Sequence, residues 1–385
     1  MQTTRLALLG GAAMALASSA YAGGVERSNQ GIDFLFEQGT YVELGFGRLD
    51  PDVSGEVVQP GFGNANSGNM LGGENVFSLS YKQDLGENFV VGLKLDKPVG
   101  ATIRYPSGTG HPFAGSVADL ESEELTAYLM YKFSNGFSVV GGLRAQQVEG
   151  DVFLASTQYD LTTNNDREYG YMLGVAYEKP EIALRVSLTY SSAIDHTFSA
   201  SEAAIIPVAG VGNVPVSREG DFDTTIPQSV NLAFQTGIAE DTLLFGSIRW
   251  VDWSEFNINP SLYDQIIQGA SGGFSYPLAS YQSDTITYKL GIGRRFNENW
   301  SGAVTLIHEP ESGDIFGNLG PIDGRDAIAL GVTYSNDRFK ISGGVEYSRL
   351  GDAESQTPFG APGTAISDFT DNSSISYGIR IGYYF

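Results

Sequence analysis

The sequence predicts an all-β protein, a 14-stranded antiparallel transmembrane β-barrel with short periplasmic turns, long extracellular loops and a short N-terminal plug. Three observations support this fold. Apolar residues alternate with small or polar ones in many successive segments, short and long connections alternate between these segments, and the chain ends in such a segment, SISYGIRIGYYF. Antiparallel strands in even number, with tight turns at one end and long loops at the other, are typical of bacterial outer-membrane barrels.

Fourteen segments follow the period of two that is expected of half-buried strands. They span residues 40–48, 76–82, 89–96, 123–133, 137–148, 168–178, 182–194, 229–236, 242–253, 285–296, 300–308, 327–334, 339–349 and 375–385. The connections DLGEN, SNG, KPE, GIAED, NEN and SNDR are short, and those that alternate with them are much longer. Because each antiparallel strand reverses the chain, the two kinds of connection lie at opposite ends of the predicted barrel.

The two faces of each segment differ in character. In the second segment Phe77, Leu79 and Tyr81 form one face, and Ser78 and Ser80 belong to the other. An apolar face with aromatic residues near the strand ends suits lipid and its two interfaces, and a polar face suits the lumen. A sheet in hydrocarbon must also close, because no backbone group can be left without a partner.

The first 22 residues have the organisation of a secretory signal peptide. Arg5 precedes an apolar run over residues 6–17, and Ala20-Tyr21-Ala22 supplies the small residues of a cleavage site. The apolar run is shorter than the ~20 residues that a membrane-spanning helix needs. We therefore expect cleavage after Ala22 and export of the remaining chain.

The composition excludes several classes of function. A net charge of -23 opposes binding to nucleic-acid phosphates, and the absence of cysteine removes disulfides and thiolate metal sites. The three histidines, His111, His196 and His308, lie far apart, and none has a second ligand at metal spacing. We expect no nucleic-acid partner, no metal and no cofactor.

A short segment precedes the first predicted strand. Residues 23–39, GGVERSNQGIDFLFEQG, form the predicted plug, and residues 40–385 form the barrel. A barrel of fourteen strands is too wide for its wall side chains to fill, so an apolar segment can insert as a stopper. Phe34 and Phe36 in this segment are candidate ligand contacts.

Two of the long loops, residues 201–217 and 264–278, are rich in apolar residues. The candidates for ligand contact are Ile205, Ile206, Val208, Ile266, Ile267 and Phe274. Apolar side chains in segments that face water indicate a surface for a hydrophobic ligand. The alternative is that they pack the loops against one another.

Further candidates lie in the predicted wall. Pro98 and Gly100 directly follow the third strand, where a missing ladder donor and an unusual backbone either open the wall or simply end the strand. Arg144, Lys289 and Arg295 occupy predicted lumen positions. They are candidate partners for a ligand carboxylate, although cations also line inert lumens.

Six stretches together resemble one known family. They are RVSLTYSSAIDHTFSA (185–200), the hairpin TTIPQSVNLAFQTGIAEDTLLFGSIRWVDWSEF (224–256), TYKLGIGRRFNENWSGAVTLIHE (287–309), LDPDVSG after the first strand, KPVGATIRY after the third, and the C-terminal ISYGIRIGYYF. Their order and spacing resemble the outer-membrane transporters of long-chain fatty acids and other hydrophobic compounds (FadL/TodX type). The segment before the first strand is shorter than in that family and lacks its Asn-Pro-Ala-like motif.

The resemblance implies a barrel in the bacterial outer membrane with an N-terminal hatch. It implies passive uptake of hydrophobic molecules such as long-chain fatty acids, captured by extracellular loops and released sideways through an opening near the third strand. The implied partners are the cargo, outer-membrane lipid and lipopolysaccharide, and the barrel assembly machinery, which recognises an aromatic C-terminal residue.

Two alternative functions remain open from the sequence. A general porin for small hydrophilic solutes would have the same barrel with a charged constriction. An outer-membrane hydrolase would need convergent catalytic groups. The imaginable sets are His308 with Glu309 and Glu311, or His196 with Asp195 and Ser192.

Overall fold

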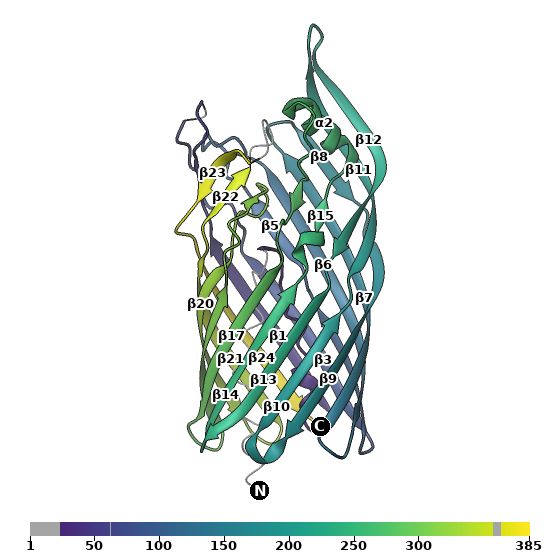
Figure 1. The fold of residues 1–385 in the computed structure, drawn as a ribbon, viewed down its shortest axis with the longest axis vertical. Helices are drawn as coiled ribbons and strands as arrows, with labels where there is room; N and C mark the ends of the chain where they lie inside the picture. The colour runs from purple at the N-terminus through teal and green to yellow at the C-terminus, as the bar shows by residue number, and fades with distance from the viewer. Residues whose placement is uncertain (1–23, 62, 357–362) are drawn as a thin grey trace.

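The computed structural model describes residues 24–61, 63–356 and 363–385. These residues form a closed, tilted barrel with irregular structure at one end (Figure 1). The predicted signal peptide, residues 1–22, lies outside the described residues. No helix in the described part of the chain has the length and apolarity needed to cross a membrane.

Fourteen strands of the described chain make the wall. They are β1 (Tyr41–Asp52), β3 (Glu74–Leu85), β4 (Phe89–Asp96), β6 (Val117–Lys132), β7 (Phe137–Leu154), β9 (Asp166–Lys179), β10 (Leu184–Ser191), β13 (Ser229–Ala239), β14 (Thr242–Val251), β17 (Thr285–Arg295), β18 (Trp300–Glu309), β20 (Arg325–Ser335), β21 (Phe339–Leu350) and β24 (Ser373–Tyr384). Each pairs antiparallel with the next along the chain. The predicted number and order of wall strands are confirmed.

The first and last strands close the barrel. Val42 lies opposite Tyr383, and Leu44 lies opposite Ile381. β1 pairs on its other side with β3. The alternation that makes SISYGIRIGYYF apolar on one face thus continues across the seam, so the closure leaves no break in the outer apolar surface.

Alternation places apolar side chains outside and polar ones inside. Outward Leu125, Leu143 and Leu290 are exposed, with 74% of Leu143 accessible, whereas inward Ser80 and Lys82 are buried. Aromatic side chains cluster outside near the turn end of the wall, as in the pair of Trp300 with Tyr334 and that of Phe339 with Tyr383. The outer surface is therefore a lipid-facing band bounded by an aromatic belt.

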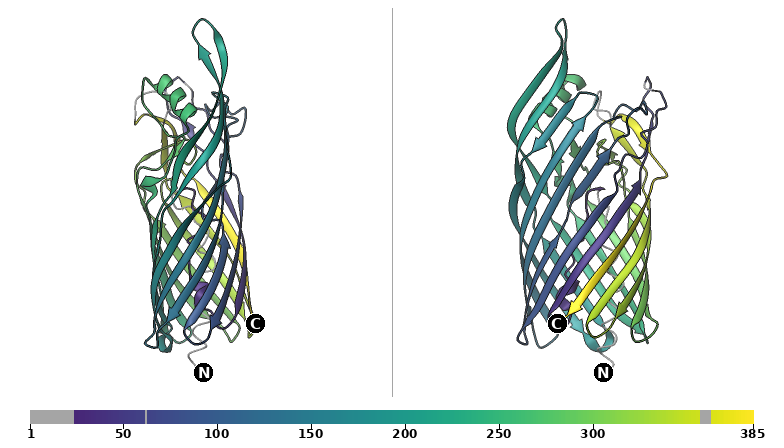
Figure 2. Two further views of the ribbon diagram at one scale, coloured as in Figure 1. Left: turned by 90° about the vertical axis from the view of Figure 1, so that its right-hand side faces the viewer. Right: turned by 180° about the vertical axis from the view of Figure 1, so that it is seen from behind.

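The C-terminus and the six short turns lie at the lower end of the barrel in Figure 1, and the long connections lie at the upper end. We call these the turn end and the loop end. One long connection rises as a hairpin of β11 (Ile194–Val208) and β12 (Gly212–Ile226), which projects beyond the other loops (Figure 2).

This hairpin corrects two expectations. The seventh predicted strand, residues 182–194, is divided at Ser192 and Ala193 into β10 and the start of β11. Residues 201–217, predicted to be a loop, continue the β11–β12 ladder, in which Ile206 lies opposite Val214. Side chains in residues 201–217 continue to alternate between the two faces of the ladder. The strands can therefore stay paired beyond the membrane, and the chain does not have to become a loop at the membrane surface.

The remaining loop-end elements are short. β5 (Gly100–Arg104) and β8 (Tyr159–Thr163) extend the wall, α2 (Ser261–Ser271) lies beside the hairpin, and β15 (Asn257–Ile258) pairs with β16 (Ala279–Ser280). A four-stranded sheet contains β2 (Glu56–Val57), β19 (Ile315–Phe316), β22 (Ala353–Gln356) and β23 (Ala365–Phe369). Three one-turn helices, η2 (Asp33–Phe36), η3 (Pro180–Ile182) and η4 (Trp253–Glu255), complete the described elements.

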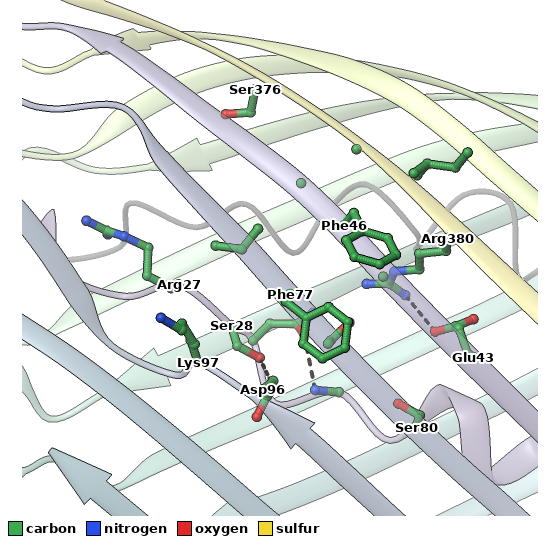
Figure 3. A pocket seen from close by; sticks show the side chains of 18 of the residues that line it. Arg27, Ser28, Glu43, Phe46, Phe77, Ser80, Asp96, Lys97, Ser376 and Arg380 are labelled. Atoms are coloured by element: carbon green, nitrogen blue, oxygen red, sulfur yellow. Dashed lines mark hydrogen bonds and ion pairs between the residues drawn. The ribbon is translucent and has the colours of Figure 1, made fainter.

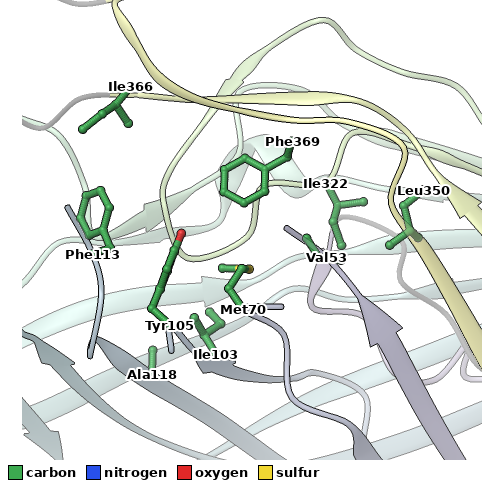
Figure 4. Packing of buried hydrophobic residues seen from close by; sticks show 10 residues of the cluster. All are labelled: Val53, Met70, Ile103, Tyr105, Phe113, Ala118, Ile322, Leu350, Ile366 and Phe369. Atoms are coloured by element: carbon green, nitrogen blue, oxygen red, sulfur yellow. The ribbon is translucent and has the colours of Figure 1, made fainter. Parts of the chain in front are cut away.

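A small core, which we call the loop core, packs against β23 of the four-stranded sheet (Figure 4). It consists of Val53, Met70, Ile103, Tyr105, Phe113, Ala118, Ile322, Leu350, Ile366 and Phe369. His111 lies against it with 3% of its surface exposed, stacks on Tyr105 and shares a 2.9 Å hydrogen bond between Nε2 and Ser367 Oγ. Loops from distant parts of the chain are thereby held together at one side of the barrel mouth.

Candidate functional site

The segment before β1 lies inside the barrel. η2 places Phe34 and Leu35 against Val90 of β4 and Met130 of β6, and Leu35 is completely buried. Phe34 meets Tyr128 edge to face, with 5.6 Å between ring centroids. Large apolar side chains of this segment therefore fill part of the lumen near the turn end, which the wall side chains alone cannot do.

Charged residues join this segment to strands around the barrel. Both Arg249 Nε and Nη2 on β14 donate to Glu26 Oε1, at 2.7 and 2.5 Å. Arg27 Nε donates to Glu74 of β3 at 2.6 Å. Glu26 and Arg249 are less than a tenth exposed, so this pair is desolvated and specific for the inserted position.

Three more bonds hold the segment lower down. Ser28 Oγ donates to Asp96 of β4 at 2.5 Å, and Arg185 Nη2 of β10 donates to Asp33 at 2.6 Å. Glu37 accepts from Lys340 Nζ of β21 at 2.5 Å. The segment is thus bound to opposite sides of the wall. The Arg185 guanidinium also lies over the ring of Phe36, with 4.6 Å between Arg185 Cζ and the ring centroid.

The wall ladder is interrupted next to this segment. β4 pairs with β3 only over Leu79–Leu85, and β5 pairs with β6 but not with β3. Between β4 and β5 the chain turns inward: Arg27 N donates to Pro98 O and Gly100 N donates to Val25 O, both at 2.8 Å. The stretch of β3 above Leu79 therefore has no ladder partner on that side, until Gly72 N bonds Thr102 O.

A pocket of about 90 Å³ lies at this interruption (Figure 3). Its lining includes lumen side chains such as Asp96, Glu43 and Arg380 together with Phe46 and Phe77 from the outer face. Arg380 and Glu43 are ion-paired in the view of Figure 3. This pocket is therefore lined by side chains from both faces of the wall, at the point where the ladder between β3 and its neighbour is interrupted.

A chamber of about 70 Å³ with a mostly apolar lining lies beside the start of the inserted segment. Val25 borders it below, and Phe198, Phe222 and Phe256 line its sides. Asp119 and Thr163 are its only charged or hydroxyl-bearing lining residues among the described part of the chain. The lining of the chamber therefore suits apolar groups.

A larger cavity of about 570 Å³ lies among the loops and shares Leu278 and Leu319 with the chamber. Ile266 and Ile267 of α2 line it, as does Phe274 after the helix. The predicted apolar loop 264–278 thus borders the mouth. By contrast, Ile205, Ile206 and Val208 lie in the projecting β11–β12 hairpin and do not line this cavity.

Glu202 of β11 positions α2 over the cavity. Its carboxylate accepts from the backbone N–H of Leu262 and Tyr263 at 3.0 and 2.9 Å, and from Tyr159 Oη at 2.8 Å. An anion at the first turn of a helix satisfies N–H groups that have no partner within the helix. No sequence pattern predicts this bond, because 60 residues separate Glu202 from Leu262.

The three predicted lumen cations have different partners. Arg144 forms a bidentate pair with Glu124, with Nε and Nη2 donating at 3.0 and 2.8 Å, and both side chains are buried. Arg295 pairs with Asp241 in a short turn at the turn end. Lys289 faces the lumen on β17, in electrostatic range of Arg325, Glu346, Glu26 and Arg249.

The sequence does not predict that Lys289 and its four charged neighbours lie together in the lumen. Arg325 Nη1 donates to Glu346 Oε1 at 2.7 Å, whereas Arg325 Nε and Nη2, Glu346 Oε2 and Glu26 Oε2 are buried without a hydrogen-bond partner among the described residues. A buried guanidinium with two unused donors is a costly arrangement and is suited to receive an anion. The polar positions were predictable from alternation, but their convergence was not.

The catalytic constellations considered from the sequence do not assemble. His308 and Asp326 point outward from the wall, while Glu309 is buried inside. His196 bonds Asp166 inside, whereas Asp195 faces outward and accepts from Thr225. No group of three or more His, Asp or Glu side chains in residues 24–61, 63–356 and 363–385 converges to hold a metal ion.

Comparisons with known proteins agree with this geometry. Residues 9–362 match the family described as outer membrane protein transport protein (OMPP1/FadL/TodX). No match was found among curated protein sequences.

Similar solved structures include a Pseudomonas aeruginosa FadL homologue, with TM-score 0.69, 14% identity and 91% of each chain covered. The P. putida toluene transporter TodX gives TM-score 0.63 at 13% identity, again with 91% of each chain covered. The Ralstonia pickettii toluene transporter TbuX gives 0.61 at 15% identity, covering 91% of this chain and 90% of the other. At such identities the likeness shows a common fold.

A closed 14-stranded barrel with an apolar outer surface, a polar lumen and an inserted N-terminal segment defines the class of outer-membrane β-barrels. The match over most of the sequence makes the assignment more specific: the chain belongs to the OMPP1/FadL/TodX family. It is a bacterial outer-membrane barrel that transports hydrophobic compounds. The family consists of transport channels and not enzymes, so the hydrolase alternative is set aside.

Proposed function

We propose that this channel passively transports long-chain fatty acids, with the loop cavity as the capture site and the interrupted wall as the exit. The observation that carries the proposal is the continuity of apolar surface from the loop cavity into the chamber through Leu278 and Leu319. An acyl chain would cover this surface with CH₂ groups, each contributing about 0.8 kcal/mol on burial.

The exit is argued from the interrupted ladder. The inward turn between β4 and β5 removes main-chain bonds that would otherwise seal β3 to its neighbour. Pro98 and Gly100 flank the turn, and the carbonyl of Pro98 accepts from Arg27 N of the inserted segment. We propose that residues 23–39 act as a plug, and that its displacement connects the chamber to the wall pocket.

The carboxylate of a fatty acid would bind the cation group formed by Lys289, Arg249 and Arg325. Glu26 of the plug now neutralises part of this group through Arg249. A ligand carboxylate would replace Glu26 there, since both present the same charge and the same acceptor geometry. Of the other two predicted cations, Arg144 already has a bidentate partner and Arg295 is paired at the turn end.

Neutral aromatic hydrocarbons are a second candidate cargo, favoured by one observation. The chamber is about 70 Å³ and is lined almost entirely by apolar side chains, which suits a small molecule without a charged group. Two of the similar structures are named toluene transporters. A general porin is less well supported, because the plug occupies part of the lumen.

The test is binding and uptake of radiolabelled oleate and toluene by the full chain and by Lys289→Met. We expect oleate binding about tenfold weaker in the variant, as for loss of one charge-assisted bond, with toluene binding unchanged. Arg294→Met is the matched control, because Arg294 faces outward at a turn and bonds Glu240 and Thr242. Sugar-driven liposome swelling at porin-like rates, without oleate binding, would contradict the proposal.

Two further proposals concern the ends of the chain. Deletion of residues 23–39 would change uptake if this segment gates the channel. Phe385 at the C-terminus, which is 78% exposed, is our proposed recognition element for the barrel assembly machinery. Phe385→Ser would lower the amount of assembled barrel in the outer membrane without changing transport per barrel.

A further inference from the structure

Three ionisable side chains form a row on the lipid-facing wall at its loop end. His308 of β18 lies opposite Asp326 of β20, and Asp326 lies opposite Arg349 of β21. All three alternate with buried neighbours and point outward. Charged side chains on the lipid face of a barrel are unfavourable unless they meet a partner, so this row requires an explanation.

The bonds within the row leave one cation without a partner. His308 Nδ1 and Asp326 Oδ1 are 2.7 Å apart, and their side chains are 59% and 74% exposed. Tyr288 stacks on the His308 ring at a centroid distance of 6.4 Å and an interplanar angle of 22°. Arg349 is exposed and forms no ion pair or side-chain hydrogen bond with any residue that the structure describes.

An apolar groove lies directly on the membrane side of the row. It has a volume of about 640 Å³ and includes His308 and Asp326 at its end. Its outward lining residues are Phe234, Ile248, Tyr288, Leu290, Leu306, Ile328 and Tyr347. Leu306 near its centre is 59% exposed, so the groove is open to the hydrocarbon of the membrane.

The height of the row fits a lipid headgroup. Tyr288 of β17 lies opposite His308, at the same height on the wall. Tyr347 is the next outward residue from Arg349 on β21, on the turn-end side. Tyrosine at a strand end marks the membrane interface, with its ring in the chains and its hydroxyl at the headgroups. His308 and Arg349 therefore stand at headgroup level, and the groove stands at the level of the acyl chains.

We propose that this face binds one outer-leaflet glycolipid that carries a phosphate. Arg349 presents a planar fork of donors that matches phosphate. When His308 is protonated, its Nε2–H supplies a second donor from the neighbouring side of Asp326. Asp326 holds the imidazole ring in place through Nδ1, which leaves Nε2 directed away from the pair. An acyl chain of the same lipid lies in the groove along Leu306 and Ile328.

The test uses the purified full chain with lipid A and with enzymatically dephosphorylated lipid A, and native mass spectrometry counts the bound lipid. We expect Arg349→Glu to bind lipid A about tenfold more weakly than the parent, because one charge-assisted contact becomes a repulsion. Arg167→Glu is the matched control: Arg167 is also an exposed outward arginine beyond an interface tyrosine, Tyr169, but it bonds Gln147 at 2.6 Å and does not line this groove. Its lipid binding should equal that of the parent.

A second variant keeps the test decisive if Arg349→Glu does not fold. Leu306→Trp fills the groove without changing charge and should also reduce lipid A retention. Equal retention of phosphorylated and dephosphorylated lipid, or equal loss in Arg167→Glu and Arg349→Glu, would overturn the proposal. A dimer of this chain that is abolished by Leu306→Trp would overturn it as well, because a second copy would then be the occupant.

Discussion

Neutralising Glu26 should release the plug. In Glu26→Gln the buried Arg249 guanidinium loses the negative partner that now accepts two of its N–H groups at 2.7 and 2.5 Å, beside two further cations. Removing one member of a buried ion pair costs about 3 kcal/mol or more. Because every 1.4 kcal/mol is a factor of ten, the population with a displaced plug should rise about 100-fold.

A single cysteine can report this change, since the native chain has none. Val25 is 6% exposed and its carbonyl accepts from Gly100 N, so Val25→Cys should react with a maleimide only when the plug moves. When the plug returns faster than the maleimide reacts with the cysteine, the labelling rate is proportional to the population with a displaced plug. We expect labelling about 100-fold faster when Glu26→Gln is added to Val25→Cys.

The matched control changes the same charge at a half-buried position of the same segment. Asp33 pairs with Arg185, and their side chains are 35% and 15% exposed, so Asp33→Asn should cost under about 1 kcal/mol and raise labelling less than about fivefold. Equal labelling rates for Glu26→Gln and Asp33→Asn, or no increase in either, would refute the inference that the buried Glu26–Arg249 pair holds the plug more strongly than the Asp33–Arg185 pair does.

The loop end yields two more predictions. Burial lowers the pKa of His111 to about 4, so its imidazole stays neutral in the folded loop core while the unfolded form titrates at about 6.5. The free energy of opening of the loop core should therefore fall by up to about 3 kcal/mol as the pH falls from 6.5 through 4. Hydrogen exchange, corrected for the intrinsic rates at each pH, measures this free energy. His111→Gln should remove its dependence on pH. Glu202→Gln should lower the free energy of opening of α2, measured by hydrogen exchange, by about 1–2 kcal/mol. Glu219→Gln, at an exposed position of the same hairpin, should leave that free energy unchanged. An α2 that exchanges equally in both variants would show that Glu202 does not position it.

The wall was predictable because its physics is local. Lipid on one side and a polar lumen on the other impose a period of two, and that period can be read from residues such as Phe77 to Tyr81 without knowing any contact. The same reasoning paired the first strand with the last. It failed at residues 201–217, because alternation does not stop at the membrane surface when a ladder continues into water.

The site was predictable in part. Ile266, Ile267 and Phe274 were recognised as apolar residues in a water-facing loop, and they line the loop cavity. The equally apolar Ile205 and Ile206 lie elsewhere, on a hairpin. Composition marks both loops in the same way, and only the paths of the chain distinguish them.

The sequence by itself determined the class of protein: the number of strands, which face meets lipid, which end carries the loops, and the family. Only the tertiary structure decided which charges meet. Glu26 and Arg249 are 223 residues apart, and Arg144, Lys289 and Arg295 are indistinguishable by alternation. Alternation follows from the solvent on each side of one strand, whereas an ion pair across the lumen depends on barrel closure, on strand tilt and on the inward turn at Pro98, which brings the plug to the wall.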